Sequence, residues 1–202
     1  MTVRLVAAVI GFLLGSIPFS YLLAKSVGGL DIRAVGSGNV GATNVARFAG
    51  WRLGVVALLL DAAKGAAAAC AGRALAAGPD ALAAGAVAGG MAILGHVFTP
   101  WLGFRGGKGV ATGAGVFAVL QPAAVGIALA AFASAVALSR MVSLGSVAAA
   151  TMLPIAALGL GAPRPVVVLA FGAGALILWT HRGNIARMWN RSEHRIGSGG
   201  TA

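Results

Sequence analysis

The sequence predicts an all-α fold, a polytopic membrane helix bundle with about seven transmembrane helices. Of its 202 residues, 59% are hydrophobic and only 9% are charged, and the mean hydropathy is +0.93. An ordinary soluble domain carries about a quarter charged residues. The apolar residues also fall into runs that approach the roughly 20 residues needed to cross a bilayer. We expect a single transmembrane domain over residues 1–193 and a flexible cytoplasmic tail over 194–202.

Seven apolar stretches are candidates for membrane crossings. The first follows Arg4 as a signal peptide would, but no convincing cleavage site comes after it, so we interpret it as a retained span. The fourth and fifth are short and meet at Gln121-Pro122, which suits either a tilted pair with a tight turn or a re-entrant hairpin. Six or fewer crossings is the alternative. The stretches are 3–24, 54–78, 81–103, 109–122, 123–139, 144–161 and 165–181.

The basic residues set the expected orientation. There are 15 Lys and Arg against 4 Asp and Glu, a net charge of +11, and they lie mainly at the ends of apolar segments, which argues against nucleic-acid binding. An external N-terminus and a cytoplasmic C-terminus place most of them inside, as membrane topology favours. The inner set is Lys25, Arg33, Arg47, Arg52, Arg105, Lys108, Arg140, Arg182, Arg187, Arg191 and Arg195.

The same topology gathers the polar motifs on one side of the membrane. The loop 25–53, the turns 103–109 and 139–146, and the tail from His181 all face the cytoplasm, whereas the outer loops are short and plain. Connectors alone would not differ in this way. The cytoplasmic surface is therefore the expected working face.

The run Gly36-Ser-Gly-Asn-Val-Gly-Ala-Thr-Asn44, followed by Arg47, is the most informative motif. Glycines and small polar residues can wrap backbone N–H groups around an anion, and Arg47 adds charge. The letters also match a dinucleotide fingerprint, but that motif needs a βαβ unit around it. Phosphate binding remains the favoured interpretation over a purely structural turn.

A second basic turn, Gly103-Phe-Arg-Gly-Gly-Lys-Gly109, resembles a Walker loop but lacks its first glycine and its Ser or Thr. It predicts a flexible turn before a helix that starts near Gly109, with Lys108 as a substrate contact; the alternative is a simple positive-inside loop. His96 precedes this turn and suits either packing or a supporting contact of the site.

His181 closes the last span, and Asn184 shares its helical face if the helix continues through Gly183. On the same side, the hydroxyls of Ser143 and Ser146 could contact phosphate or cap a helix, with capping favoured for Ser146. Asp61 and Lys64 lie within the second span, where we expect them to neutralise each other, because a membrane-buried charge is costly unless it is paired.

Two absences limit the chemistry. No aspartate lies five residues after a histidine, so the common glycerolipid acyltransferase dyad is missing. The four carboxylates are scattered, which predicts no metal site and no cofactor. The single Cys70 excludes an internal disulfide.

An ordered set of motifs resembles the bacterial acyl-phosphate:glycerol-3-phosphate acyltransferases, from about residue 11 to 193. Departures are modest: Ser20 stands where glycine is usual, Thr99-Pro-Trp101 is variable, and the tail around Glu193 strays. The matching segments are Gly15-Ser-Ile-Pro-Phe-Ser-Tyr-Leu22, Ser37-Gly-Asn-Val-Gly-Ala-Thr-Asn-Val-Ala-Arg47, Leu60-Asp-Ala-Ala-Lys-Gly65, Gly95-His-Val-Phe98, Gly106-Gly-Lys-Gly-Val-Ala-Thr112, Arg140-Met-Val-Ser-Leu-Gly-Ser146 and His181-Arg-Gly-Asn-Ile-Ala-Arg187.

The resemblance implies acyl transfer from acyl phosphate to the 1-hydroxyl of glycerol 3-phosphate. It implies a bacterial inner-membrane enzyme with a cytoplasmic site, supplied by a soluble enzyme that makes acyl phosphate. The resemblance and the chemistry of the motifs together predict two groups of site residues. The catalytic group is His181, Asn184, Lys108, Arg47 and Ser37, and the substrate-binding group is Asn39, Gly41, Ala42, Thr43, Asn44, Ser143 and His96.

Two questions stay open on the sequence alone. The general base is either His181 or a substrate phosphate. The chief rival function is a membrane transporter of a phosphorylated metabolite, which should place polar residues near the bilayer midplane; a purely structural membrane subunit would leave the one-sided motifs unexplained. For the acyl tail we expect a groove between spans rich in Gly and Ala.

Overall fold

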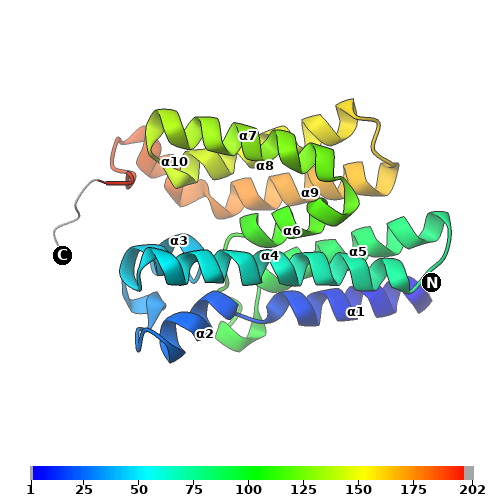
Figure 1. The fold of residues 1–202 in the computed structure, drawn as a ribbon, viewed down its shortest axis with the longest axis horizontal. Coiled ribbons are helices and arrows are strands. Elements are labelled where there is room, and N and C mark those ends of the chain that lie inside the picture. Colours follow the sequence, from blue (N-terminus) through cyan, green and yellow to red (C-terminus); the bar gives the residue numbers. More distant parts are fainter. Residues whose placement is uncertain (1, 198–202) are drawn as a thin grey trace. The chain divides into compact units, whose positions relative to one another are not determined.

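The structure, a computed structural model, describes residues 2–197, and within that range every regular element is a helix. The last residues of the predicted tail, 198–202, lie outside the described ones. The chain divides into two compact units, residues 1–120 and 121–202 (Figure 1). The first holds α1 (Thr2–Ser16), α2 (Phe19–Ser26), η1 (Ile32–Ala34), α3 (Ala42–Phe48), α4 (Trp51–Ala74), α5 (Pro79–Val97), η2 (Pro100–Leu102) and α6 (Val110–Leu120).

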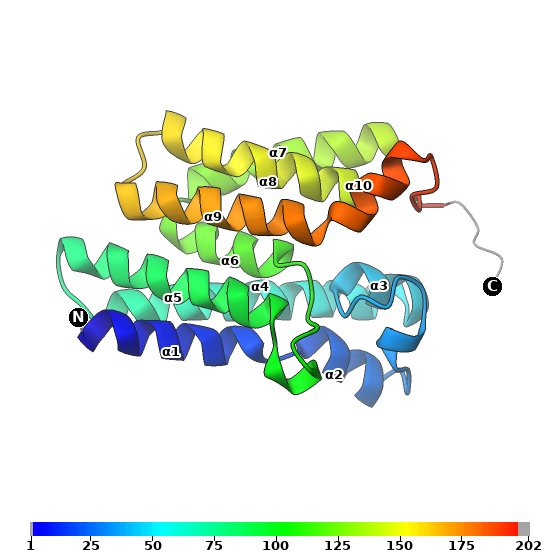
Figure 2. The ribbon, with the colours of Figure 1, turned by 180° about the vertical axis from the view of Figure 1, so that it is seen from behind.

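In the first unit, α4 packs against α1, α5 and α6, and α1 also lies along α5 (Figure 2). Glycines bring these helices close together. A Cβ at Gly15 would overlap the backbone of Ala92, and a Cβ at Gly65 would overlap that of Thr112. Such close approach gives membrane helices dispersion contacts and is how small residues stabilise their packing.

The first apolar stretch is a broken helix. α1 ends at Ser16 and α2 begins at Phe19, with Pro18 between them. Proline has no backbone N–H and cannot continue the helical hydrogen bonds, so a break here is expected. The freed carbonyl groups find partners elsewhere: Thr99 Oγ1 donates to Ser16 O at 2.6 Å, and Lys64 Nζ donates to Ile17 O at 2.7 Å.

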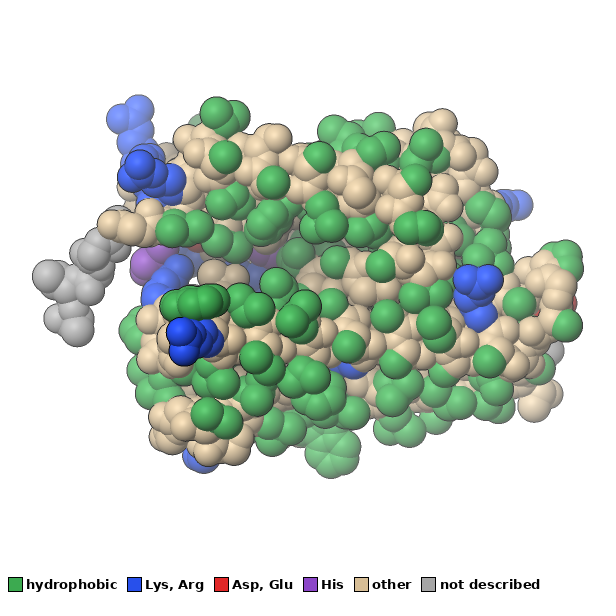
Figure 3. Space-filling model, viewed as in Figure 1, with side chains coloured by type: hydrophobic (Ala, Val, Ile, Leu, Met, Phe, Trp, Pro, Cys, Tyr) green, Lys and Arg blue, Asp and Glu red, His purple; other side chains and the backbone are tan. Residues whose placement is uncertain are grey.

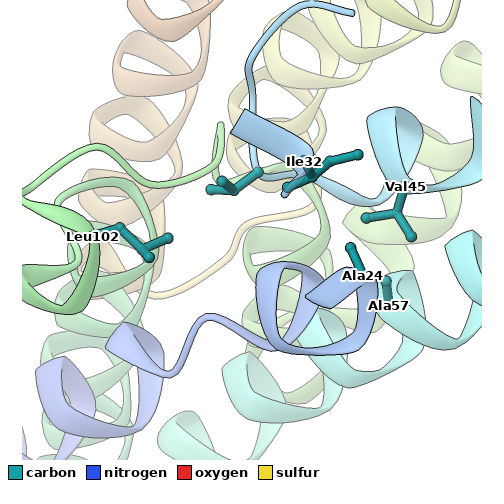
Figure 4. Packing of buried hydrophobic residues seen from close by; sticks show 6 residues of the cluster. Ala24, Ile32, Val45, Ala57 and Leu102 are labelled. Carbon is teal, nitrogen blue, oxygen red and sulfur yellow. The ribbon is translucent and has the colours of Figure 1, made fainter. Parts of the chain in front are cut away.

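A small apolar core supports the long polar loop between α2 and α4. Ala24, Ile32, Val45, Ala57 and Leu102 are buried together, although they come from five different elements (Figure 4). These contacts fix the loop by its apolar side chains, while Gly36, Ser37 and Gly38 stay exposed.

The second unit holds α7 (Pro122–Ser139), α8 (Val142–Gly159), α9 (Arg164–Thr180) and α10 (Arg182–Trp189). α8 packs against both α7 and α9. α9 ends at Thr180 and α10, which runs through Gly183, begins at Arg182; the two helices meet at His181 with a bend of 56°. His181 therefore stands at a corner, not on one continuous helical face with Asn184.

Five helical segments in residues 2–197 are long and apolar enough to cross a membrane, or six if the bent α9–α10 pair is one span. Each of the seven predicted stretches is largely helical, but α6 has 11 residues, which at 1.5 Å per residue is about half of a 30 Å hydrocarbon core. Large apolar side chains such as Leu59, Leu138 and Val168 are exposed, and hydrophobic atoms cover much of the surface (Figure 3). The chain is an integral membrane protein.

Candidate active site: two polar clusters

The glycine-rich loop of the first unit is held by its own asparagine. Asn44 is 3% exposed, and its Nδ2 donates to Ile32 O at 3.2 Å and to Val35 O at 3.1 Å. Gly36 has φ +58°, and a Cβ there would overlap the Phe48 ring, so only glycine fits. The amide donor of Asn44, a predicted substrate contact, thus holds the shape of the loop.

The other predicted residues of this loop face outward around its edge. Gly41 precedes α3, so the N–H groups of Ala42 and Thr43 stand in the first helical turn, where backbone donors have no intrahelical partner. Ser37, Thr43 and Arg47 are exposed. The loop therefore presents a hydroxyl, backbone amides and a guanidinium, a set suited to an anion.

The second basic turn docks on the end of α5. Gly106 N donates to Val97 O at 2.9 Å, and Gly107 N donates to His96 O at 3.1 Å. Asn39 of the glycine-rich loop adds a long hydrogen bond, 3.5 Å from its Nδ2 to Gly106 O. These contacts bring Asn39, His96 and Lys108 into one neighbourhood.

A buried polar network lies beneath this turn. The predicted Asp61–Lys64 pair is confirmed, with Nζ 2.8 Å from Oδ1 and both side chains at most 3% exposed. Two further groups join it: Ser20 Oγ donates to Asp61 Oδ2 at 2.6 Å, and His96 Nδ1 lies 3.6 Å from Asp61 Oδ1. The sequence predicted the pair but not Ser20 or His96 as its partners.

The second unit builds its cluster at the bend between α9 and α10. His181 is 3% exposed, with Nδ1 2.8 Å from Ile177 O. A carbonyl only accepts, so Nδ1 carries a proton, and in the neutral form of the ring Nε2 is the nitrogen left to accept. Asn184 is 8% exposed and donates from Nδ2 to Glu193 Oε1 at 2.7 Å.

Glu193 organises this cluster, although no pattern in the sequence singled it out. Its other oxygen accepts from Arg187 Nε at 2.7 Å. Burial alone would raise the pKa of Glu193, but hydrogen bonds from Asn184 and Arg187, together with the nearby Ser143 hydroxyl, outweigh it, and the net pKa is lowered. Glu193 is thus a carboxylate that anchors Asn184 and the start of α8.

Ser143 and Ser146 fall inside α8, so neither is the N-cap of this helix, which is Met141. Ser143, in the first turn, is buried beside Glu193. Ser146 donates from Oγ to Val142 O at 3.0 Å. The predicted capping role of Ser146 is wrong: its hydroxyl instead satisfies itself on the preceding turn of its own helix.

All four carboxylates of the chain are paired with cations. Asp31 and Arg33 form one exposed pair: the hydrogen bond from Arg33 lowers the pKa of Asp31 to about 2. The others pair Arg4 with Asp80, Lys64 with Asp61 and Arg187 with Glu193. No group of three or more His, Cys, Asp or Glu that could hold a metal occurs in the described range. Cationic side chains outnumber these pairs, which suits anionic ligands.

An apolar groove of about 380 Å³ lies at the start of α4. Its lining includes Val27, Ala49, Leu53 and the exposed Trp51, with Arg52 at the edge. The groove joins the end of α2 to the segment that follows α3. Three of its seven lining residues, Gly28, Ala49 and Gly50, are Gly or Ala; the groove expected for the acyl tail stays a prediction.

Fold and clusters together define an integral membrane protein whose cationic and amide-rich loops suit anionic ligands. The family model described as Glycerol-3-phosphate acyltransferase matches residues 5–191. The chain belongs to the glycerol-3-phosphate acyltransferase family.

Relatives and solved structures cover nearly the whole chain. A glycerol-3-phosphate acyltransferase of Myxococcus xanthus is 47% identical over 188 residues, covering 93% of this chain and 96% of that protein. One of Roseobacter denitrificans is 49% identical over 190 residues, covering 94% and 92%. The crystal structure of PlsY, an integral membrane glycerol 3-phosphate acyltransferase, in its glycerol 3-phosphate form superposes with a TM-score of 0.90 at 36% identity, covering 96% of each chain. Its lysophosphatidic acid form gives a TM-score of 0.87 at 34% identity.

Proposed function

We propose that this protein transfers a fatty acyl group from acyl phosphate to the 1-hydroxyl of sn-glycerol 3-phosphate. The hydroxyl oxygen bonds to the acyl carbon, the acyl–phosphate bond breaks, and lysophosphatidic acid and inorganic phosphate leave. The observation that carries the proposal is membership of the family, together with the likeness to PlsY in forms with glycerol 3-phosphate and lysophosphatidic acid. An acyl phosphate is an activated anhydride, so direct attack needs no covalent enzyme intermediate.

The first unit binds phosphate in this proposal. Lys108, Arg47 and Ser37 hold the phosphate of glycerol 3-phosphate, while the amides near Gly41, Ala42 and Thr43 hold that of the donor. The supporting evidence is that these groups gather on two glycine-containing loops that share the Asn39–Gly106 hydrogen bond. Charge-assisted hydrogen bonds from such groups also stabilise the phosphate that leaves.

The second unit acts on the attacking hydroxyl. His181 accepts its proton at Nε2, because Nδ1 is committed to Ile177 O. Asn184, held by Glu193, and Ser143 position glycerol 3-phosphate. A general base contributes about 10²- to 10⁴-fold to the rate. If replacing His181 lowers kcat by less than that, a substrate phosphate and not His181 accepts the proton.

The membrane arrangement completes the proposal. We place the protein in the bacterial inner membrane with seven crossings, an external N-terminus, and both polar clusters on the cytoplasmic side, as the basic residues favour. A soluble enzyme that forms acyl phosphate then supplies the donor from the cytoplasm, where glycerol 3-phosphate is also available.

The deciding experiment uses purified protein in detergent with acyl phosphate and labelled glycerol 3-phosphate. The proposal predicts labelled lysophosphatidate and one phosphate per turnover, with no need for acyl-CoA or acyl carrier protein. Product formed only from a thioester donor would contradict the assigned donor. No product from any donor, with uptake of glycerol 3-phosphate into vesicles, would favour the transporter.

A further inference from the structure

The charged pair inside α4 is more than a neutralised pair of membrane-buried charges. Asp61 has three partners, on its own helix and on two others: Lys64 on α4, Ser20 on α2 and His96 near the end of α5. Lys64 in turn donates to Ile17 O at the break between α1 and α2. The network thus joins the broken first span, α4 and α5 around a single carboxylate.

His96 links this carboxylate to the turn that carries Lys108. Its Nδ1 side faces Asp61 at 3.6 Å, and its Nε2 side packs so closely on Gly107 that a Cβ there would overlap that nitrogen. The backbone carbonyl groups of His96 and Val97 accept from Gly107 and Gly106. The orientation of the imidazole ring therefore sets where Gly107 lies, and Lys108 follows directly.

The network acts on the site indirectly, because the cavity that it lines is too small to hold the substrate. The cavity at its centre has a volume of about 10 Å³ and is lined by Ser20, Asp61, Lys64 and His96 together with Val40 and Gly107. Such a volume is close to that of one water-sized probe and far too small for glycerol 3-phosphate. Its lining nevertheless includes residues from both loops assigned to phosphate binding.

Stability alone does not explain the pair. Ionised groups in a membrane span are expensive, and a buried ion pair replaced by apolar residues is often as stable or more so. The costly groups here converge on one feature, the face of His96 opposite Gly107. Their arrangement fits a role in fixing a geometry.

We propose that Asp61 is a positioning residue for glycerol 3-phosphate binding: with Ser20 and Lys64 it fixes the His96 ring, which holds the Gly106–Gly107 turn and so places Lys108. This inference rests on the proposed function of Lys108 as a phosphate ligand. Neither Asp61 nor His96 touches the substrate in this account. The defect on removing either is therefore one of substrate binding, not of chemistry.

The test measures kcat and both KM values for Asp61→Asn, His96→Ala and their double variant in detergent. Asp61→Asn should raise the KM for glycerol 3-phosphate about tenfold, a coupling typical of residues in one network, with kcat and the KM for acyl phosphate little changed. The double variant should show no further rise, because both changes release the same turn. An unchanged KM in folded Asp61→Asn, or additive effects in the double variant, would overturn the inference.

Two more variants separate positioning from structure. Asp61→Asn leaves the Lys64 charge unpaired, and adding Lys64→Met removes that charge. Relative to Asp61→Asn alone, the thermal stability of this variant should recover while its KM for glycerol 3-phosphate stays raised. Recovery of the KM would count against positioning. Thr112→Val, which alters a fully buried hydroxyl on α6, is the matched control and should leave the KM unchanged. The wild type distinguishes the two failures, since no product from acyl phosphate defeats the proposed function before any variant is compared.

Discussion

The two units present their polar groups in opposite ways. In the first, Ser37 stands exposed on a loop shaped by glycines, and Thr43 and Arg47 stand exposed on α3 directly after it. In the second, His181, Asn184 and Ser143 are all at most 8% exposed and are tied to backbone or to Glu193. Exposed cations and amides suit the capture of a charged ligand, whereas a buried, oriented imidazole suits proton transfer. The comparison predicts that variants of the first unit change KM and that variants of the second change kcat.

The largest effect is expected at His181. Replacing His181 by Ala should lower kcat by about 10²- to 10⁴-fold, the range of general acid–base catalysis, with a small change in the KM for glycerol 3-phosphate. Steady-state kinetics with saturating acyl phosphate measure both. His194→Ala, which alters an exposed histidine, is the control and should be near wild type. If His181→Ala raised only the KM, the assignment of binding to the first unit and of chemistry to the second would be wrong.

Lys108 comes next. A hydrogen bond to a charged group contributes about 1.5–3 kcal/mol, and 1.36 kcal/mol corresponds to tenfold, so Lys108→Ala should raise the KM for glycerol 3-phosphate about 10- to 100-fold. Arg105→Ala removes the same charge from the same turn at an exposed position and should change the KM about twofold or less. Equal effects would mean that Lys108 contributes only to the general positive field.

Glu193 tests whether the second cluster depends on its carboxylate. Glu193→Gln weakens the hold on Asn184 and Arg187, so kcat should fall about tenfold, a loss of roughly one charge-assisted hydrogen bond. Asp80→Asn, which breaks an exposed pair with Arg4, is the matched control and should retain full activity. Equal losses of kcat in the two variants would show that the second cluster does not depend on the Glu193 carboxylate.

The same carboxylate predicts a pH dependence of stability. Its pKa is lowered in the folded protein from the ordinary value of 4.5, so its stabilising contribution is present above that value and is lost as the pH falls through the folded pKa. Thermal unfolding of the wild type between pH 6 and more acidic pH should therefore show a loss that Glu193→Gln lacks. Identical acid sensitivity in both proteins would contradict the assignment.

The smallest effect is expected from the shape of the glycine-rich loop. Gly36→Ala meets both a left-handed backbone and the Phe48 ring, whereas Gly29→Ala meets the same backbone strain in open space. Backbone strain costs about 1–2 kcal/mol in both variants, so the overlap with Phe48 is the difference between them. Gly36→Ala should therefore raise a substrate KM several-fold more than Gly29→Ala does. Matching KM values would show that the contact with Phe48 does not matter.

Local sequence patterns predicted the membrane helices and most candidate residues, because apolar runs and glycine-rich turns consist of residues that are neighbours in the sequence. The partners of Asp61 were beyond this reasoning: Ser20 and His96 lie on other helices and meet it only through tertiary packing. Glu193 escaped for the same reason, since its contacts with Asn184 and Ser143 depend on the chain folding back after α10. The bend at His181 was also missed, because no proline marks it and the one nearby glycine, Gly183, lies within α10.

The most direct test of the central claim, that both units present their polar clusters to the cytoplasm, is the sidedness of single cysteines. In a Cys70→Ala background, Ala34→Cys reports the first unit, Ser192→Cys reports the second and Ala77→Cys reports the opposite ends of the helices; all three positions are exposed. In intact cells, an impermeant thiol reagent should label only Ala77→Cys, with the other two labelled after the membrane is opened. Labelling of Ala34→Cys and Ser192→Cys from opposite sides would contradict the account.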